Sequence, residues 1–278
     1  MGITVRDALR DAERRLSSAG IDEARREAGW LLAHLLGTSA GALRLRAGEP
    51  HTAIAEYDEL LRRRELREPL QYILGSEEFM GLTFQVTPAV LIPRFDTEVV
   101  VRAALSELHG CVRIADIGTG SGVIAIALAH RLPQAEVIAV DISPEALAVA
   151  AGNAKAHGVA DRVTFRQGDL LSPLAGERLD AIVSNPPYIR ADEIPDLMPE
   201  VRDWEPRLAL SPGPDGLACY RELARQAGGY LQSGGQLAVE VGAGQAAAVQ
   251  RMFAEAGFVT SVYPDTAGIP RAVVGRLV

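Results

Sequence analysis

Residues 112–132 read VRIADIGTGSGVIAIALAHRL, which places a short apolar run, a glycine-rich turn and a longer apolar run in direct succession. The first run ends at Ile117 and has the length of a buried strand, whereas the second is long enough for a helix. Gly118, Gly120 and Gly122 let the backbone between the runs turn tightly and approach a ligand closely. We therefore predict a strand, a sharp turn and a helix, which is the repeating unit of α/β folds.

The alternation of strand and helix continues to the end of the sequence. Further strands are predicted at 135–141, 162–169, 179–185, 234–242, 258–264 and 271–278. Further helices are predicted at 143–158, where Ser143 caps the helix and Pro144 lies in its first turn, and at 216–231 and 244–257. This alternation predicts a largely parallel sheet that helices cover on both faces.

Residues 1 to about 68 have the periodicity of helices. Thr4 is expected to cap a first helix, Asp22 is expected to cap a second, and a longer helix is predicted over 52–67. The arginine run 62–64 is interpreted as a solvated face of that longer helix. Together these segments predict a small helical bundle.

The change of pattern after the bundle defines the domain organisation. Residues 76–92 are predicted to form a β-hairpin linker with its turn at Met80 and Gly81. The fold class is therefore α/β, with an N-terminal helical domain at 1–75, the hairpin linker and a Rossmann-like seven-stranded domain at 93–278.

Composition excludes several classes of protein. The chain has 278 residues and a formal net charge of −8, so non-specific binding to nucleic acid should be poor. Cys111 and Cys219 are the two cysteines and form no CxxC pair, which argues against a disulfide framework or a structural metal site. The N-terminus lacks the apolar stretch of a signal peptide, and the longest apolar run is too short to span a bilayer. We expect a cytoplasmic protein with no membrane contact.

Acidic residues near the ends of two neighbouring strands point to a nucleoside ligand. Asp141 ends the second strand of the series, where its carboxylate can accept hydrogen bonds from ribose hydroxyls. Asp169 ends the third strand and can reach an adenine amino group, and Leu170 can pack on the ring. The glycine spacing is not that of a dinucleotide fingerprint, and the loop has no P-loop lysine. S-adenosylmethionine is the cofactor that fits best.

The stretch SNPPYI at 184–189 ends the fourth strand and so faces the same crevice. The Asn185 side chain and the Pro186 carbonyl offer two oxygen acceptors, which can hold both hydrogens of a planar NH2 group. Tyr188 can lie against the face of that group. Adenine N6, cytosine N4 and a carboxamide all satisfy these contacts. The predicted reaction is in-line methyl transfer that depends on alignment and preorganised dipoles rather than on a strong base.

A set of motifs links these features in one order. The set comprises PLQYILG at 69–75, LIPRFDTE at 91–98, DIGTGSG at 116–122, AVDIS at 139–143, GDL at 168–170, SNPPYI at 184–189, EPRLAL at 205–210 and PDGL at 214–217. With them the chain resembles the protein-(glutamine-N5) methyltransferases that modify bacterial peptide-chain release factors. The LIPRFDTE stretch distinguishes this group from nucleic-acid methylases that share the NPPY motif.

The resemblance implies a class I methyltransferase that binds S-adenosylmethionine and methylates the glutamine of the release factor's Gly-Gly-Gln loop. The N-terminal helical domain would help to recognise the release factor, and the enzyme would be a monomer that needs no metal and no direct contact with nucleic acid. The cofactor positions would be Gly118, Thr119, Gly120, Ser121, Gly122, Asp141, Asp169, Leu170 and Asn185. The glutamine pocket would consist of Asn185, Pro186, Pro187 and Tyr188, with Asn185, Pro186 and Tyr188 as the catalytic residues.

The sequence departs from the family pattern at three positions. Phe95 replaces a proline, Leu170 replaces an aromatic residue and Pro214 replaces a glycine. These changes could alter the pocket rim, weaken stacking on adenine and stiffen a loop, respectively. The segment 189–214 lacks clear periodicity, and we interpret it as an irregular lid over the incoming glutamine.

Three other functions share part of this evidence. An N6-adenine or N4-cytosine nucleic-acid methyltransferase would explain the NPPY motif, although not the negative net charge. A methyltransferase that acts on a glutamine of a ribosomal protein would share the catalytic motifs. A cofactor-binding scaffold without activity is the third alternative, and the intact NPPY motif argues against it.

Overall fold

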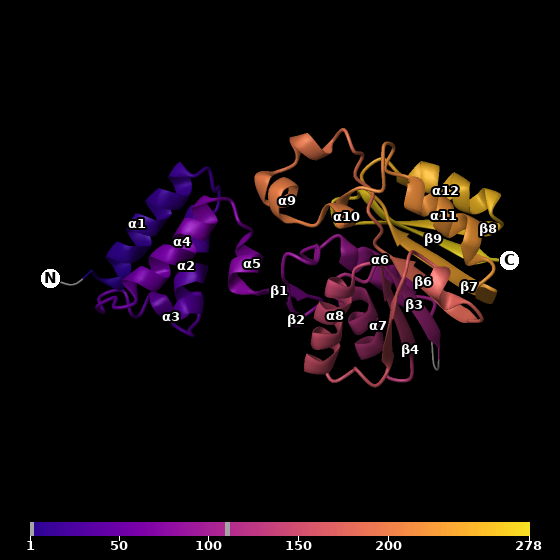
Figure 1. Cartoon of the computed structure of the whole chain (residues 1–278), viewed down its shortest axis with the longest axis horizontal. Helices are drawn as coiled ribbons and strands as arrows, with labels where there is room; N and C mark the ends of the chain where they lie inside the picture. Colours follow the sequence, from indigo (N-terminus) through magenta and orange to yellow (C-terminus); the bar gives the residue numbers. More distant parts are fainter. Residues whose placement is uncertain (1–2, 109–111) are drawn as a thin grey trace. The chain divides into compact units, whose positions relative to one another are not determined.

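The computed structural model describes residues 3–108 and 112–278, and Cys111 lies outside this part of the chain (Figure 1). The chain forms two compact units. The first comprises Met1–Ser76 together with Met198–Trp204, and the second comprises Glu77–Leu197 and Glu205–Val278. The first unit therefore includes a short segment that the sequence places far from its other residues.

The first unit is a helical bundle. Its helices within the N-terminal stretch are α1 (Val5–Ser18), α2 (Ala24–Leu35), α3 (Ala40–Leu43), α4 (Ile54–Glu65) and α5 (Leu70–Leu74). Their apolar faces enclose one core, to which Leu16, Leu31 and Leu61 contribute. The Thr4 cap is confirmed, because its hydroxyl accepts a hydrogen bond from the Asp7 backbone N–H at 3.2 Å.

The predicted Asp22 cap is wrong. The residue at the cap position of α2 is Glu23, and its side chain makes no capping hydrogen bond. The first turn of the helix closes on the Glu23 carbonyl, which accepts hydrogen bonds from the backbone N–H groups of Arg26 and Glu27. Asp22 lies in the preceding turn and is one residue too early to cap.

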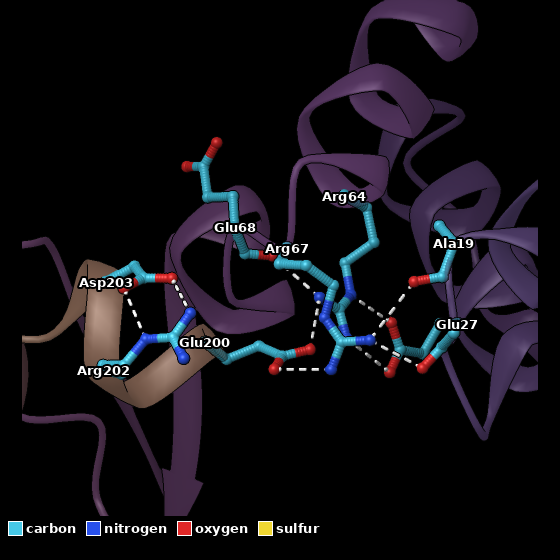
Figure 2. A network of polar contacts seen from close by, with 9 residues as sticks. Ala19, Glu27, Arg64, Arg67, Glu68, Glu200, Arg202 and Asp203 are labelled. Carbon is cyan, nitrogen blue, oxygen red and sulfur yellow. Dashed lines mark hydrogen bonds and ion pairs between the residues drawn. The ribbon is translucent and has the colours of Figure 1, made fainter. Parts of the chain in front are cut away.

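A buried ion-pair network joins the N-terminal helices to α9 (Pro199–Trp204), which belongs to the same unit (Figure 2). Glu200 of α9 forms an ion pair with Arg64 at 2.9 Å, and it accepts a hydrogen bond from Arg67 at 2.7 Å. Arg64 also donates to Glu27 of α2 at 2.6 Å. The interpretation of residues 62–64 as a solvated face is therefore wrong at Arg64, which is buried because it serves two carboxylates.

A two-stranded sheet formed by β1 (Ser76–Phe79) and β2 (Leu82–Gln85) follows, and all of it except Ser76 belongs to the second unit. The hairpin prediction is confirmed there, with Met80 and Gly81 both at positive φ in the turn, whereas 86–92 is irregular. The Asn153 side chain fixes the end of β2, because it accepts from the Gln85 N–H at 2.8 Å and donates to the Gln85 carbonyl at 3.0 Å.

The main sheet has seven strands in the order β5-β4-β3-β6-β7-β9-β8. Adjacent strands from β5 to β7 are parallel, and β9 runs antiparallel to both of its neighbours. This arrangement confirms the largely parallel seven-stranded sheet. The strands are β3 (Arg113–Ile117), β4 (Glu136–Asp141), β5 (Val163–Gln167), β6 (Leu179–Ser184), β7 (Leu231–Glu240), β8 (Phe258–Pro264) and β9 (Pro270–Leu277).

Helices cover both faces of this sheet, as expected (Figure 1). One face packs against α6 (Thr97–Leu105), α7 (Val123–Arg131) and α8 (Pro144–Ala156), and the other packs against α11 (Ala218–Ala227) and α12 (Ala246–Glu255). The Ser143 cap of α8 is confirmed, and α6 was not expected. No helix among the described residues has the length and apolar character needed to cross a membrane.

The segment 189–214 is more regular than its sequence predicts. It contains a 3₁₀ turn at Ile194–Asp196, then α9, and then the short helix α10 (Arg207–Leu210). The expectation of a segment without regular structure is therefore wrong. Its helices are too short to produce a recognisable apolar period.

The chain reverses its direction of travel across the sheet at β3. From β3 it proceeds to β4 and β5 on one side, and it then crosses to β6 on the other side. In the parallel register of β3 and β6, Ile117 is opposite Ser184, and the Ser184 hydroxyl donates to the Ile117 carbonyl at 2.7 Å. The glycine loop and Asn185 thus leave adjacent strands at the same edge, where open α/β sheets bind their ligands.

Candidate active site

A cavity of about 540 Å³ opens at this edge, within the size range of small-molecule sites. It is formed by residues of the second unit alone. The predicted site residues that line it are Gly118, Thr119, Gly120, Ser121, Asp141, Asp169, Leu170, Asn185 and Pro187. The remaining predicted residues, Gly122, Pro186 and Tyr188, are not among the described residues that line the cavity.

The glycine loop is held by hydrogen bonds to β4. The backbone N–H groups of Gly118 and Thr119 both donate to the Val140 carbonyl at 2.9 Å. Gly118 and Gly120 have φ values of 71° and 54°, which explains why glycine stands at both positions. The loop thereby exposes its backbone to the cavity.

Gly122 has a structural position at the start of α7. A β-carbon there would lie 3.0 Å from both Ala150 Cβ and Ile126 Cδ1. The residue also has a φ of 84°. Its small size lets the loop pack closely against α8, so the cavity wall depends on Gly122 without including it.

Asp141 connects the loop to the cavity. One carboxylate oxygen accepts from the Gly120 N–H at 2.9 Å, and the other accepts from the Ser143 N–H at 2.9 Å. A carboxylate oxygen can accept more than one hydrogen bond. The side chain is therefore fixed in place and can still accept from the hydroxyl groups of a ligand.

Asp116 lies beneath the loop and is fully buried. One of its oxygens accepts from the Thr119 hydroxyl at 2.6 Å and from the Ala125 N–H at 3.0 Å. Burial raises the pKa of this carboxyl to about 7, because desolvation outweighs these two hydrogen bonds. Asp116 holds the loop and the start of α7 together.

The NPPY corner, residues 185–188, is held in place by Thr97 and Glu240, which were not predicted as site residues. The Asn185 side-chain NH2 donates to the Thr97 hydroxyl at 3.0 Å, and that hydroxyl donates to the Glu240 carboxylate at 2.6 Å. The Tyr188 hydroxyl donates to the other Glu240 oxygen at 3.3 Å. Burial raises the pKa of Tyr188 and raises that of Glu240 to about 7.

Two sequence signals pointed to these missed residues. Thr97 lies within the motif LIPRFDTE, and Glu240 is a lone charge at the end of a buried strand. Neither signal says that the two side chains meet, because 143 positions separate them.

A basic residue lines the same cavity. The Arg94 side chain is 38% exposed and donates to Glu205 at 2.5 Å, and Glu205 is buried. Burial raises the pKa of the Glu205 carboxyl despite the adjacent guanidinium. The cavity therefore combines a cation, three carboxylates and apolar surface. This set suits a nucleoside with an amino-acid tail, so the residues fit S-adenosylmethionine.

Two protein-family models match the chain. The PrmC N-terminal domain matches residues 7–75, and the methyltransferase small domain matches residues 96–198. The two matches together cover the helical bundle and the first part of the second unit.

Curated relatives match over almost the whole chain. A release factor glutamine methyltransferase from Geobacter sulfurreducens is 47% identical, and the match covers 99% of this chain and 97% of the relative. A second, from Moorella thermoacetica, is 49% identical over 97% of both chains. Among solved structures, a methyltransferase from Pyrococcus furiosus has a TM-score of 0.54 at 16% identity, covering 71% of this chain and 90% of that one. The last similarity concerns the fold alone.

Proposed function

This chain belongs to the release factor glutamine methyltransferase family, and we propose that its NPPY corner holds the acceptor glutamine while its glycine loop holds the methyl donor. The enzyme is an S-adenosylmethionine-dependent methyltransferase, and its acceptor is the side-chain nitrogen of the glutamine in the Gly-Gly-Gln motif of release factors. The observation that supports the residue roles is the β3–β6 register, which brings Gly118 and Asn185 to one cavity.

The donor, when bound, supplies a methyl group on a positively charged sulfur, which needs no further activation. The task left to the protein is to place the acceptor nitrogen in line with that group. In our proposal the Asn185 side-chain oxygen and the Pro186 carbonyl accept the two hydrogens of the glutamine NH2. These fixed acceptors favour a pyramidal nitrogen and aim its lone pair, so alignment and preorganised dipoles lower the barrier. The lone pair forms the new nitrogen–carbon bond as the carbon–sulfur bond breaks, and the nitrogen then loses one proton.

The rest of the corner supports these two acceptors. Pro187 lines the cavity beside Asn185. The Tyr188 carbonyl accepts from the Gln245 side chain at 2.9 Å, and the Tyr188 hydroxyl donates to Glu240. Tyr188 is thus bonded at both ends of the residue. We assign it to holding the corner rigid, with its ring beside the acceptor amide.

The cofactor roles follow from the positions around the loop. We assign the ribose hydroxyls to Asp141, the adenine amino group to Asp169 and the adenine ring to Leu170, which line one cavity. Arg94 joins this set as the cation for the carboxylate of the amino-acid tail. The exposed backbone of residues 118–121 would lie along the ligand.

The remaining roles concern the partner protein. We propose that the helical unit contributes to recognition of the release factor, and that segment 205–214 covers the incoming glutamine, because Pro206, Leu208 and Pro212 line the cavity. We further propose that the enzyme acts in the cytoplasm as a monomer and does not bind nucleic acid directly. The net charge of −8 favours a protein partner over a phosphate backbone.

The test offers the purified protein and S-adenosylmethionine to a release factor, a ribosomal protein and DNA in separate reactions. Mass spectrometry then locates each added methyl group. We expect one methyl on the Gly-Gly-Gln glutamine and none on a control release factor whose glutamine is replaced by glutamate. Methylation of the ribosomal protein or of DNA in place of the release factor would refute the proposal.

A further inference from the structure

The hydrogen-bond chain behind Asn185 has a fixed direction, and that direction determines what Asn185 presents to the cavity. We propose that Glu240 is a positioning residue that acts through Thr97 to keep the Asn185 side-chain oxygen facing the acceptor amide. The inference deepens the proposed function and rests on it. Glu240 itself does not line the cavity in the described part of the chain.

The geometry of the chain supports this role. Thr97 Oγ1 lies 2.6 Å from Glu240 Oε2 and 3.0 Å from Asn185 Nδ2. Glu240 is 1% exposed and Thr97 is 2% exposed, so bulk water does not compete for either contact. The three side chains come from β7, α6 and the end of β6, which are well-packed elements of one unit.

The chemistry of the partners sets the direction. A hydroxyl has one hydrogen to donate. An ionised carboxylate has none, so Glu240 can act only as an acceptor, and the Thr97 hydroxyl donates its one hydrogen bond to Glu240. The Thr97 oxygen is left to accept, so the NH2 end of the Asn185 amide must turn toward it. The oxygen end of Asn185 then faces the cavity.

The opposite orientation would prevent the reaction. Without an acceptor at position 240, the Thr97 hydrogen is free to turn toward Asn185, and the Asn185 amide can rotate by 180°. Its NH2 group would then face the NH2 group of the substrate, and two donors cannot form a hydrogen bond. Glu240 therefore controls the acceptor function of a residue that it does not touch.

The groups around Glu240 tune its charge. Tyr188 and Tyr220 contribute hydroxyls, the first to a side-chain oxygen and the second to the backbone carbonyl at 2.9 Å. Arg271 favours the ionised form and Asp96 opposes it, and these two form an ion pair of their own at 3.0 Å. With burial, the pKa of Glu240 reaches about 7. Only the ionised form is an obligate acceptor, so methyl transfer should weaken as the pH falls through 7.

The first variants change the acceptor. Glu240→Met keeps a similar side-chain volume and removes both oxygens. We expect kcat to fall by about 100-fold, the scale of a misaligned reacting group. The Kd for S-adenosylmethionine, measured by calorimetry, should stay within about twofold, since the donor-binding residues are untouched. Glu240→Gln retains one oxygen, so it should recover part of the activity, and its kcat should no longer change between pH 6 and 8.

The second variants test the path through Thr97. Thr97→Ser keeps the hydroxyl and should keep most of the activity, whereas Thr97→Val should lose about as much as Glu240→Met. The double variant Glu240→Met/Thr97→Val should have the same kcat as Thr97→Val alone. Both substitutions interrupt the same hydrogen-bond chain, so the second adds no further loss. Glu98→Gln is the matched control, because Glu98 is also buried and follows Thr97 on α6. It should retain wild-type kcat.

The outcomes separate the two claims. Wild-type kcat in Glu240→Met, or losses that multiply in the double variant, would overturn the positioning role and leave the proposed function intact. Failure of the wild-type enzyme to methylate a release factor would overturn both. If Glu240→Met does not fold, the contrast between Thr97→Val and Thr97→Ser decides, and equal activity of those two would overturn the inference.

Discussion

Arg94 and Glu205 form an ion pair at 2.5 Å, although 111 positions separate them in the sequence. The pair joins the two motifs LIPRFDTE and EPRLAL, and no local pattern in the sequence predicts that these motifs are in contact. Glu205 is buried, and the residues that follow it, including Pro206 and Leu208, line the cavity. The pair therefore holds the cavity-lining residues that follow Glu205 in place beside Arg94, which also lines the cavity.

The Arg94→Met variant should lose both stability and affinity for S-adenosylmethionine. Removing the arginine leaves the buried Glu205 without its ionic partner, which costs stability, whereas replacing both partners is often close to neutral. We expect Arg94→Met/Glu205→Gln to regain most of the unfolding free energy but not the cofactor affinity. Denaturant titration and calorimetry report the two quantities separately. Recovery of both in the double variant would contradict the assignment of Arg94 to the cofactor.

The Asn185→Ala variant should abolish methyl transfer and leave cofactor binding measurable. The substitution removes one of the two proposed acceptors for the substrate NH2, while Asp141 and the glycine loop remain in place. Mass spectrometry of the release factor and calorimetry with S-adenosylmethionine measure the two effects. Tyr188→Phe is a useful comparison, because it removes only the hydroxyl that donates to Glu240 and should cost less. Near-normal turnover of Asn185→Ala would count against the mechanism.

Gly216→Ala should lower kcat more than Gly158→Ala does, although the two glycines have similar φ values of 69° and 67°. Each alanine pays the left-handed strain of about 1–2 kcal/mol. At Gly216 the new β-carbon would also lie 2.3 Å from the Tyr188 carbonyl oxygen, whereas at Gly158 no described atom lies within 4 Å.

Two measurements separate the contributions at these glycines. Both variants should lower the unfolding free energy in denaturant titration. Only Gly216→Ala should also lower kcat, because the collision moves the backbone of the NPPY corner. Equal kcat in the two variants would show that the Tyr188 backbone position does not matter for transfer.

The buried Asp116 should make stability depend on pH. Its folded pKa of about 7 lies above its ordinary value of 3.8, so the folded state keeps a proton that the unfolded state releases between those values. The contribution of Asp116 to stability is therefore complete below pH 3.8 and is lost as the pH rises toward 7, by at most about 1.4 kcal/mol per pH unit.

Asp116→Asn isolates this contribution. The variant cannot ionise, so the unfolding free energy of the wild type minus that of the variant should decrease from pH 5 to pH 7 and then level off. Denaturant titrations of both proteins at a series of pH values give this difference, and the contribution of Glu240 cancels between them. A difference that stays constant over this range would refute the burial argument.

Local signals in the sequence were sufficient for much of the fold. Thr4 and Ser143 act on backbone groups a few residues away, so their capping roles follow from short patterns. The strand ends that carry Gly118 and Asn185 could be located because buried parallel strands are continuous apolar runs. The same reasoning predicted the cap of α2 at Asp22, one residue before its observed position at Glu23. The ends of helices depend on backbone details that composition does not determine.

The parts of the site that could not be predicted depend on contacts distant in sequence. Thr97 and Glu240 meet only because α6 packs beside β7, and no local pattern encodes that contact. Arg64 was predicted to be a surface charge, but it is buried and forms an ion pair with Glu200. In both cases one polar residue is buried because another part of the chain supplies its partner.

The position of α9 has a consequence for any attempt to cut the protein in two. The helix lies in the C-terminal part of the sequence and packs with Met1–Ser76, with Glu200 held by Arg64 and Arg67. Hydrolysis of the peptide bond after Ser76 would therefore yield two fragments that remain associated, since the larger fragment carries Glu200, and its ion-pair partners Arg64 and Arg67 lie in the smaller one. The larger fragment expressed alone would expose Glu200 to solvent without Arg64 and Arg67. After cleavage of the whole chain, we expect the two fragments to purify together.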